Sequence, residues 1–173
     1  QLGLDYSSLG HAEPRNEIVV IWGGATSVGG NAIQLARAAG YRVITTASPR
    51  NHDRMRQLGA EAVFDYHSPD VVAQITASVA GAPVAGVLAI AVGSGTPSLK
   101  IARATSAKKV AMASPPVSFY DQPRSSGLSL QRIRLFLQLG ARSARLQLRA
   151  LTSGVKASFI WGSAIATSPV GPA

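Results

Sequence analysis

The residues whose types and spacing most clearly indicate chemistry form a glycine-rich turn. Residues 18–22 are an apolar run, residues 23–30 read Gly-Gly-Ala-Thr-Ser-Val-Gly-Gly, and residues 31–39 have helical spacing and end at Gly40. A strand, a tight turn and a helix in this order are typical of the first unit of a dinucleotide-binding βαβ fold. The turn would direct backbone N–H groups and the positive end of the helix dipole at a pyrophosphate. We therefore predict a cofactor phosphate site here, formed by Gly23, Thr26, Ser27, Val28 and Gly29. A glycine-rich turn that binds nothing is the alternative, because the usual middle glycine of the pattern is replaced by Thr26.

A second group of polar residues follows the next β-branched run, residues 42–46. An acidic residue at this position would bind the ribose 2′-hydroxyl of NAD and repel the 2′-phosphate of NADP. The sequence instead has Ser48, Arg50 and Asn51, with no acid before Asp53. A hydroxyl and a guanidinium can bind a phosphate dianion, so we predict NADPH as the cofactor. Ser48 followed by Pro49 also fits a helix N-cap, which would explain the same residues without a ligand.

These segments resemble the cofactor domain of the medium-chain dehydrogenases/reductases, above all its zinc-independent quinone oxidoreductases and fungal trans-enoyl reductases. In that branch Gly-Gly-Ala/Ser-Thr/Ser-Ser-Val-Gly and Asn-Ala-Ile-Gln-Leu-Ala recur, as does Ala-Ser-Pro-Lys/Arg-Asn. The resemblance implies that Tyr66, in Phe-Asp-Tyr, contacts the 2′-phosphate, and that Phe159 and Trp161 border the nicotinamide pocket. A plain rim tyrosine and a plain apolar strand are the alternatives for these residues.

Composition limits the remaining possibilities. The chain has 173 residues, 46% apolar and 14% charged, which suits one domain with a buried sheet. Cysteine is absent and the three histidines have no ligand spacing, so we predict no disulfide and no metal site. No apolar run reaches the roughly 18 residues that a membrane span needs. We expect a soluble, cytoplasmic protein with a small-molecule substrate, no membrane partner, nucleic acid as an improbable partner, and a homodimer as an open alternative.

The elements that must position these residues alternate between strand and helix patterns along the chain. We predict an α/β fold of Rossmann type, with a doubly wound, mostly parallel sheet and helices on both faces, over residues 17–173. Residues 1–16 are interpreted as a lead-in from a catalytic domain of GroES-like type that this sequence does not contain. The first helix is expected to pack on the sheet through one apolar face, made up of Val28, Ala32, Leu35, Ala36 and Ala39.

Residues 122–152 differ in character and are interpreted as an atypical arginine-rich insert. Their apolar residues step by threes and fours and predict one buried helix face. That face comprises Leu130, Ile133, Leu137, Ala141, Ala144, Leu148 and Leu151. Packing on the same domain or on a partner chain is the simplest interpretation. Membrane or nucleic-acid docking, or an error in the gene's reading frame, are alternatives.

The favoured function is the cofactor domain of an NADPH-dependent oxidoreductase that transfers hydride to an activated C=C bond or a quinone. The proton donor is expected from the separate catalytic domain, so no catalytic residue is assigned, and the isolated chain is expected to be inactive.

Other enzyme classes lack their required motifs in this sequence. A short-chain dehydrogenase would need Tyr-x-x-x-Lys, and a P-loop enzyme would need a lysine after the glycines; neither is present. The other class considered is a non-catalytic, basic module that binds nucleotides or nucleic acid, suggested by the net charge of +9. Its weakness is the aromatic content of only 6%, which leaves few side chains for base stacking.

Overall fold

The structure is a single six-stranded sheet with helices on both faces. This computed structural model describes residues 2, 4, 5, 12–79, 81–113, 130–152 and 154–159. The sheet order is β3-β2-β1-β4-β5-β6, and every neighbouring pair of strands is parallel. The strands are β1 (Ile18–Trp22), β2 (Arg42–Thr46), β3 (Ala62–Phe64), β4 (Val84–Ala89), β5 (Lys109–Met112) and β6 (Lys156–Phe159). The predicted fold class is confirmed.

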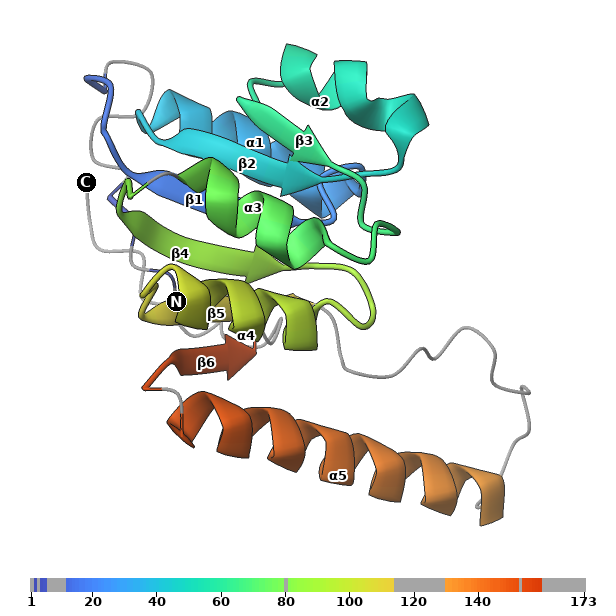
Figure 1. The fold of residues 1–173 in the computed structure, drawn as a ribbon. Coiled ribbons are helices and arrows are strands. Elements are labelled where there is room, and N and C mark those ends of the chain that lie inside the picture. The colour runs from blue at the N-terminus through green and yellow to red at the C-terminus, as the bar shows by residue number, and fades with distance from the viewer. Residues whose placement is uncertain are drawn as a thin grey trace, which may run out of the picture.

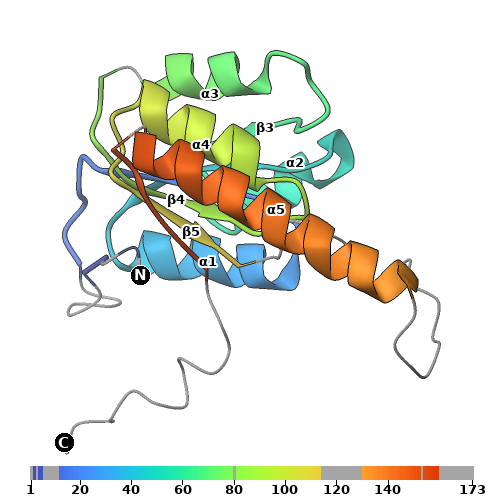
Figure 2. The ribbon, with the colours of Figure 1, turned by 90° about the horizontal axis from the view of Figure 1, so that it is seen from below.

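The helices form two layers that enclose the sheet (Figures 1 and 2). They are α1 (Ser27–Ala38), the 3-10 turn η1 (Pro49–Asn51), α2 (His52–Gln57), α3 (Val71–Val79), α4 (Gly95–Ala104) and α5 (Leu130–Thr152). Alternate residues of β1 point to opposite faces of the sheet. Val19 and Ile21 pack with buried residues of α1 and α2, whereas Val20 packs with buried residues of α3, α4 and α5. The sheet is therefore buried on both sides, as its nearly continuous apolar strands require.

All the strands end at the same edge of the sheet because they run parallel. The sheet order reverses between β1 and β4, since the chain builds outward from β1 in both directions. Ligands of open α/β sheets bind at such a switch point, outside the carboxyl ends of the strands. The glycine turn after β1, the segment after β2 and the turn after β4 all lie at this edge.

Helix α1 is rotated relative to the sequence prediction. Its buried residues are Gly29, Ile33 and Ala36, whereas Val28 and Leu35 are 52% and 50% exposed. The predicted inward face was wrong at these two positions. The reason is that Gly29 makes the closest approach to the turn before the helix, and a glycine has no hydropathy that a pattern of apolar residues would register. The helix also begins at Ser27, ahead of the predicted start at residue 31.

Helix α5 also turns a different face to the body than predicted. Leu146 and Ala150 are buried against the layer that contains α4, whereas Leu137, Leu148 and Leu151 are 68%, 63% and 75% exposed. The helix has two apolar stripes, and the sequence prediction chose the one whose described leucines face solvent; the side chains of Leu130 and Ile133 lie outside the described set. Figure 2 shows that the beginning of α5 extends beyond the rest of the described fold. Although α5 has 23 residues, no helix in the described ranges is long and apolar enough to cross a membrane.

The connection between β5 and β6 is a crossover that contains α5. Two parallel neighbours need such a connection, because a hairpin can join only antiparallel strands. Residues 114–129, which include the first part of the predicted insert, lie outside the described residues, and the interpretation of 122–152 as an insert stays a prediction. So does the interpretation of residues 1–16 as a lead-in from another domain.

Candidate dinucleotide-binding site

The turn after β1 is held to the neighbouring strand by hydrogen bonds from two of its main-chain N–H groups to Thr46. The N–H of Gly23 donates to Oγ1 of Thr46 at 3.1 Å, and the N–H of Gly24 donates to the Thr46 carbonyl oxygen at 3.0 Å. Gly23 has a φ of +97°, a conformation that residues with a Cβ rarely adopt. A glycine is therefore required where the chain turns sharply from β1 toward α1.

Gly29 allows the first turn of α1 to lie directly on this loop. A Cβ at Gly29 would collide with the carbonyl oxygen of Gly23 and lie 2.7 Å from Cα of Gly24. Because both neighbours are backbone, neither could rotate away as a flexible side chain would. A small residue here would also leave a clear path for a phosphate, but the contacts that the structure shows are those of the helix with the loop.

Thr26 closes the turn and caps α1. Its hydroxyl donates to the Gly23 carbonyl oxygen at 2.8 Å and accepts from the N–H of Gly29 at 3.0 Å. The side-chain oxygen is thereby engaged within the protein. Ser27 and Val28 follow in the exposed first turn of the helix. No acceptor within the described ranges pairs with their N–H groups, which is usual for the first turn of a helix.

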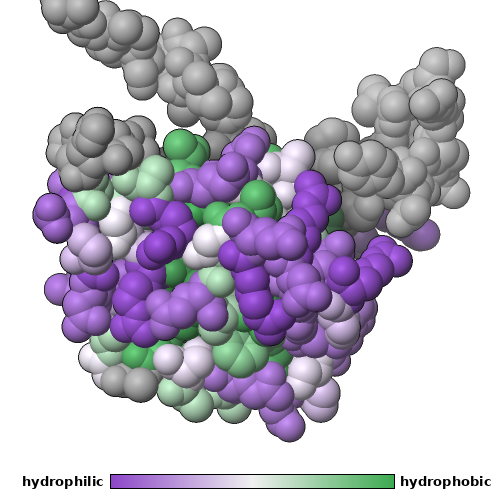
Figure 3. Space-filling model, turned by 90° about the horizontal axis from the view of Figure 1, so that it is seen from above, coloured by the Kyte–Doolittle hydropathy of each residue, from purple (hydrophilic) through white to green (hydrophobic). Residues whose placement is uncertain are grey.

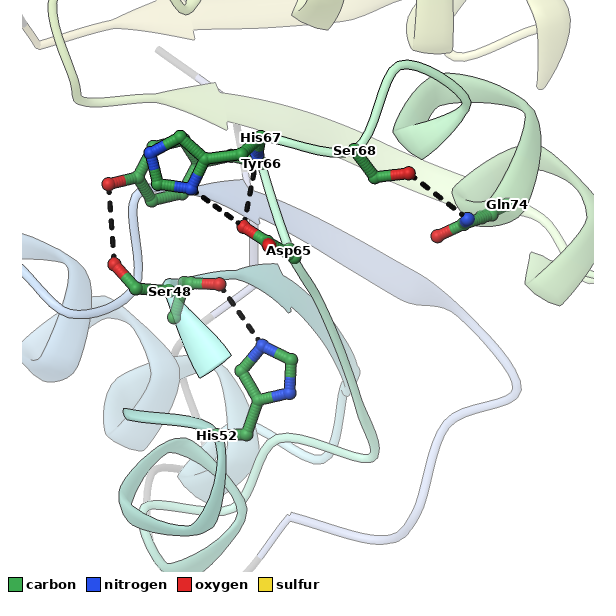
Figure 4. Close-up of polar contacts among 8 residues, drawn as sticks. Ser48, His52, Asp65, Tyr66, His67, Ser68 and Gln74 are labelled. Carbon is green, nitrogen blue, oxygen red and sulfur yellow. Dashed lines mark hydrogen bonds and ion pairs between the residues drawn. The ribbon is translucent and has the colours of Figure 1, made fainter. Parts of the chain in front are cut away.

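Ser48 and Tyr66 meet where β2 and β3 end (Figure 4). Oγ of Ser48 lies 3.3 Å from the phenolic oxygen of Tyr66, so the structure brings two predicted site residues together. Ser48 occupies the cap position before η1, but its side chain makes no capping hydrogen bond. Its hydroxyl faces Tyr66, so the N-cap alternative does not account for this side chain.

A histidine–aspartate pair stabilises the loop that contains Tyr66. Oδ1 of Asp65 accepts from the backbone N–H of His67 at 3.0 Å and lies 2.9 Å from its Nδ1. The backbone hydrogen bond, with a smaller contribution from the imidazole, holds the pKa of Asp65 below its ordinary value. The rings of Tyr66 and His67 lie against each other with centroids 4.1 Å apart. On the other side of Ser48, Nε2 of His52 lies 3.1 Å from the carbonyl oxygen of Ala47.

The other two residues predicted to read the adenosine end, Arg50 and Asn51, belong to η1. Arg50 is exposed and Asn51 is half-buried. The nearest acid in the sequence, Asp53, forms an ion pair with Arg56 at 3.0 Å. Arg50 is therefore exposed next to Ser48, and no acidic residue within the described ranges pairs with it.

The nicotinamide half of the predicted site is described only in part. Phe159 is the last residue of β6, but its side chain is outside the described set, and Trp161 lies outside the described residues altogether. Their roles stay predictions. The turn after β4 is described: Gly93 has a φ of +82° and Val92 is 52% exposed.

A pocket between α1 and α2 adds residues that the sequence did not predict. Its volume is about 360 Å³, and it lies beside the glycine turn. The lining residues are Gly24, Ala25, Thr26, Ser27, Gly30, Asn31, Gln34, Arg54, Met55 and Leu58. One sequence feature could have predicted some of these residues. Ser27, Asn31 and Gln34 are polar residues with helical spacing, so they share one helix face beside the predicted phosphate turn.

Comparison with known proteins identifies the family. The family model described as zinc-binding dehydrogenase matches residues 27–113, just over half of the chain. The chain belongs to this family. The predicted resemblance to the cofactor domain of the medium-chain dehydrogenases/reductases is confirmed.

Relatives and solved structures agree with this assignment. "Dehydrogenase pigH" of Monascus ruber is 36% identical over 174 residues, which cover all of this chain and 46% of that protein. "Trans-enoyl reductase himH" of Aspergillus japonicus is 49% identical over 75 residues, 43% of this chain and 22% of that protein. The quinone oxidoreductase of Coxiella burnetii superposes with a TM-score of 0.57 at 25% identity, over 93% of this chain and 42% of that one. The chain spans less than half the length of each of these proteins.

The family name raises the question of zinc. Zinc sites in proteins use cysteine, histidine and carboxylate ligands. The chain has no cysteine, and the described ranges contain no group of three or more His, Asp or Glu side chains that could hold a metal ion. The described residues do not fit a zinc ion, and no step of the chemistry is assigned to one.

Proposed function

We propose that this domain binds NADPH along the carboxyl edge of its sheet. We further propose that it serves an oxidoreductase that transfers hydride to an activated C=C bond or a quinone. The observation that supports the proposal most strongly is the turn between β1 and α1. Its glycines let α1 begin against the loop, and its cap directs the first turn of the helix at the sheet edge. Backbone N–H groups without protein acceptors, at the positive end of a helix dipole, are suited to a pyrophosphate.

Selectivity for NADPH is supported by the residues after β2 and β3. The Ser48 and Tyr66 hydroxyls converge there, and Arg50 lies exposed on the following turn. The nearby carboxylates of Asp65 and Asp53 are engaged by His67 and Arg56. A 2′-phosphate dianion would find hydroxyl and guanidinium donors, with the nearby negative charge partly neutralised.

The chemistry of hydride transfer would come from the bound nicotinamide, and the protein's contribution is to bind and orient it. Among the described residues, the glycine turn would hold the pyrophosphate and the turn at residues 90–94 would border the nicotinamide ribose. The reaction class is supported by the names of similar proteins, a trans-enoyl reductase and a quinone oxidoreductase. The small-molecule substrate, a cytoplasmic location, a homodimer and the inactivity of the isolated chain stay predictions.

The test is a titration of the purified chain with NADPH, NADH and single-stranded DNA. We expect saturable binding of NADPH, weaker binding of NADH and no comparable binding of DNA at physiological salt. Arg50→Ala should weaken NADPH binding by about 1.5–3 kcal/mol, the range for a hydrogen bond to a charged group, with NADH nearly unaffected. DNA binding that exceeds NADPH binding would instead identify the basic nucleic-acid module.

A further inference from the structure

The outward side of α5 carries an apolar stripe that no described residue covers. Its members follow one another at alternating steps of four and three residues, which is the spacing of one continuous helix face. The stripe consists of Leu137, Ala141, Ala144, Leu148 and Leu151, all of them exposed. Leu146 and Ala150, which pack with the α4 layer, lie on the opposite side of the helix. The stripe is therefore not used in the contact between α5 and the rest of the domain.

Exposed arginines follow this stripe along one side. Those with described side chains are Arg134, Arg142, Arg145 and Arg149. The helical spacing places them all on the same side of the stripe, whereas Gly140 and Gln147 lie on the other side. No acidic residue occurs in residues 130–152. The outward face of α5 is therefore apolar along its centre and positively charged along one flank.

The position of α5 leaves this face accessible. The helix lies next to α4 at the border of the fold, and its beginning extends beyond the other described elements (Figure 2). The surface over α2 and β3, on the far side of the molecule, is by contrast mainly hydrophilic (Figure 3). A contiguous apolar surface with a polar rim is a frequent feature of interaction sites.

We propose that this face of α5 binds an acidic amphipathic helix of another protein. Apolar side chains of the partner would pack along the stripe, and its glutamates or aspartates would lie beside the arginine flank. The alternating steps of four and three, sustained over residues 137–151, are those of a seam between two helices. Ala141 and Ala144 in the middle would let the helices approach closely, because the distance between helix axes depends on the side chains at the contact.

Other occupants match this face less well. A second copy of α5 would add further arginines and no acid, and like charges across an interface repel one another. A helix that lies on a membrane usually has a wide apolar face, often with tryptophan or phenylalanine, whereas the described stripe is narrow and contains only leucine and alanine. Nucleic acid would pair with the arginines but would leave the leucines in water. An acidic helix matches both the apolar stripe and the charge beside it.

A synthetic helix provides the probe. The peptide is about three heptads long, with leucine at both seam positions and glutamate at the flanking positions. A matched peptide has lysine in place of each flanking glutamate. Binding of both peptides to the full chain would be measured by fluorescence anisotropy at one fixed salt concentration. We expect the glutamate peptide to bind, and the lysine peptide to bind at least about tenfold more weakly because its charges face arginines.

Three variants of the chain separate the apolar contribution from the charge. Leu148→Gln should weaken the glutamate peptide by about tenfold or more, the effect of one buried leucine. Arg145→Gln should weaken it by up to about fivefold, the range of an exposed ion pair. Arg37→Gln removes the same charge from an exposed position of α1, in the opposite helix layer, and should change binding by less than about twofold. Urea unfolding checks that each variant is folded.

The alternatives give different results. The proposal is overturned if the glutamate peptide does not bind, if both peptides bind equally, or if Leu148→Gln has no effect on binding. Co-sedimentation of the chain with vesicles of phosphatidylcholine and about one quarter phosphatidylserine, lost in Leu148→Gln, would assign the face to a membrane surface instead. Dimers of the chain that disappear in Leu148→Gln would assign it to a second copy. None of these results depends on NADPH, because no residue of α5 belongs to the proposed cofactor site.

Discussion

Oγ of Ser48 lies 3.3 Å from the phenolic oxygen of Tyr66, although the two residues are 18 positions apart in the chain. They meet because β2 and β3 are parallel neighbours, so the segments after both strands emerge at one edge of the sheet. Each hydroxyl can donate one hydrogen bond and accept others. The pair therefore has donor capacity left for a ligand while it holds the two loops together.

Removal of the phenol should weaken NADPH more than NADH if this pair contacts the 2′-phosphate. We expect Tyr66→Phe to weaken NADPH by about 1.5 kcal/mol, the low end of the range for a bond to a charged group, because Tyr66 is exposed. Ser48→Ala should have a similar effect, and the double variant should lose less than the sum, since the two hydroxyls contact each other. Titration calorimetry with both cofactors measures this. Equal losses for NADPH and NADH would show that the pair supports the adenosine and not the phosphate.

Gly29 and Gly30 provide a matched test of the turn. Gly29→Ala places a Cβ against the backbone of Gly23 and Gly24 and should destabilise the fold by about 1–3 kcal/mol, the usual cost of overpacking. Gly30→Ala places its Cβ 3.4 Å from Cδ1 of Leu58, an ordinary contact, and should stabilise by about 0.4–1 kcal/mol because it restricts the unfolded chain. Urea unfolding decides the order of stability. If Gly29→Ala were as stable as Gly30→Ala, the close approach described here would be incorrect.

This contact also changes the interpretation of larger substitutions at Gly29. In Gly29→Val the added atoms meet the protein's own backbone before they meet a ligand, so this variant is expected to disturb the turn itself. Loss of binding in that variant would therefore not distinguish a blocked site from a distorted turn.

The sheet, its helical layers and the family could be predicted from the sequence, because short local patterns of residues indicate the strands and turns. β-branched runs predicted the buried strands, and the glycine turn predicted where the chain turns from β1 into α1. Ser48 and Tyr66 were both predicted as site residues. Their contact follows from the pairing of β2 with β3, which local sequence patterns do not predict.

The faces of α1 and α5 could not be predicted from apolar spacing. In α1 the inward position closest to the turn is Gly29, which contributes no hydropathy, so the pattern selected Val28 and Leu35 instead. In α5 two apolar stripes compete, and only the packing of Leu146 against the α4 layer decides between them. Arg54 was not predicted as a pocket residue for a related reason, because the pocket that it lines is formed by the space between two helices.

Helix α5 allows the buried face to be tested directly with two leucines. Leu146 is 9% exposed and Leu148 is 63% exposed. Leu146→Ala should cost about 2–3 kcal/mol of unfolding free energy, within the range for a buried leucine, whereas Leu148→Ala should change it by less than about 0.5 kcal/mol. Thermal or urea unfolding of the two variants is sufficient. A larger loss of unfolding free energy for Leu148→Ala would instead support the buried face predicted from sequence.

An ion pair between the starts of β2 and β3 predicts an acid-dependent contribution to stability. Nη2 and Nε of Arg42 donate to the two carboxylate oxygens of Glu61 at 2.6 and 2.8 Å. The Arg42 hydrogen bonds hold the pKa of Glu61 below its ordinary value of 4.5, so the folded state binds this proton less readily than the unfolded state. The contribution is therefore complete above the ordinary pKa and is lost as the pH falls through the lower folded-state pKa.

Comparison of Glu61→Gln with the unmodified chain isolates this contribution. The side chains are 34% and 49% exposed, so the pair should contribute no more than about 1 kcal/mol at neutral pH. Urea unfolding at pH 7 and at progressively lower pH should show the two proteins converging as Glu61 becomes protonated. A constant difference across the whole range would mean that the substitution acts through packing and not through charge.

The last prediction concerns Ser98, whose hydroxyl is fully buried in α4 and has no hydrogen-bond partner in the described structure. It lies one turn after Gly95, at which an added Cβ would contact Leu146 and Met112 at 3.3 and 3.5 Å, so its surroundings on this helix face are apolar. A buried polar group without a partner costs about 1–3 kcal/mol, and its removal in an apolar site recovers part of that cost. Ser98→Ala should therefore stabilise the chain by about 1 kcal/mol, since alanine also has the higher helix propensity.

Thr105→Val is a suitable control. The Thr105 hydroxyl donates to the Ile101 carbonyl oxygen at 2.8 Å, so its removal should bring no gain in stability. Urea unfolding of both variants provides the measurement, and a destabilised Ser98→Ala would show that this hydroxyl has a partner that the described contacts do not include.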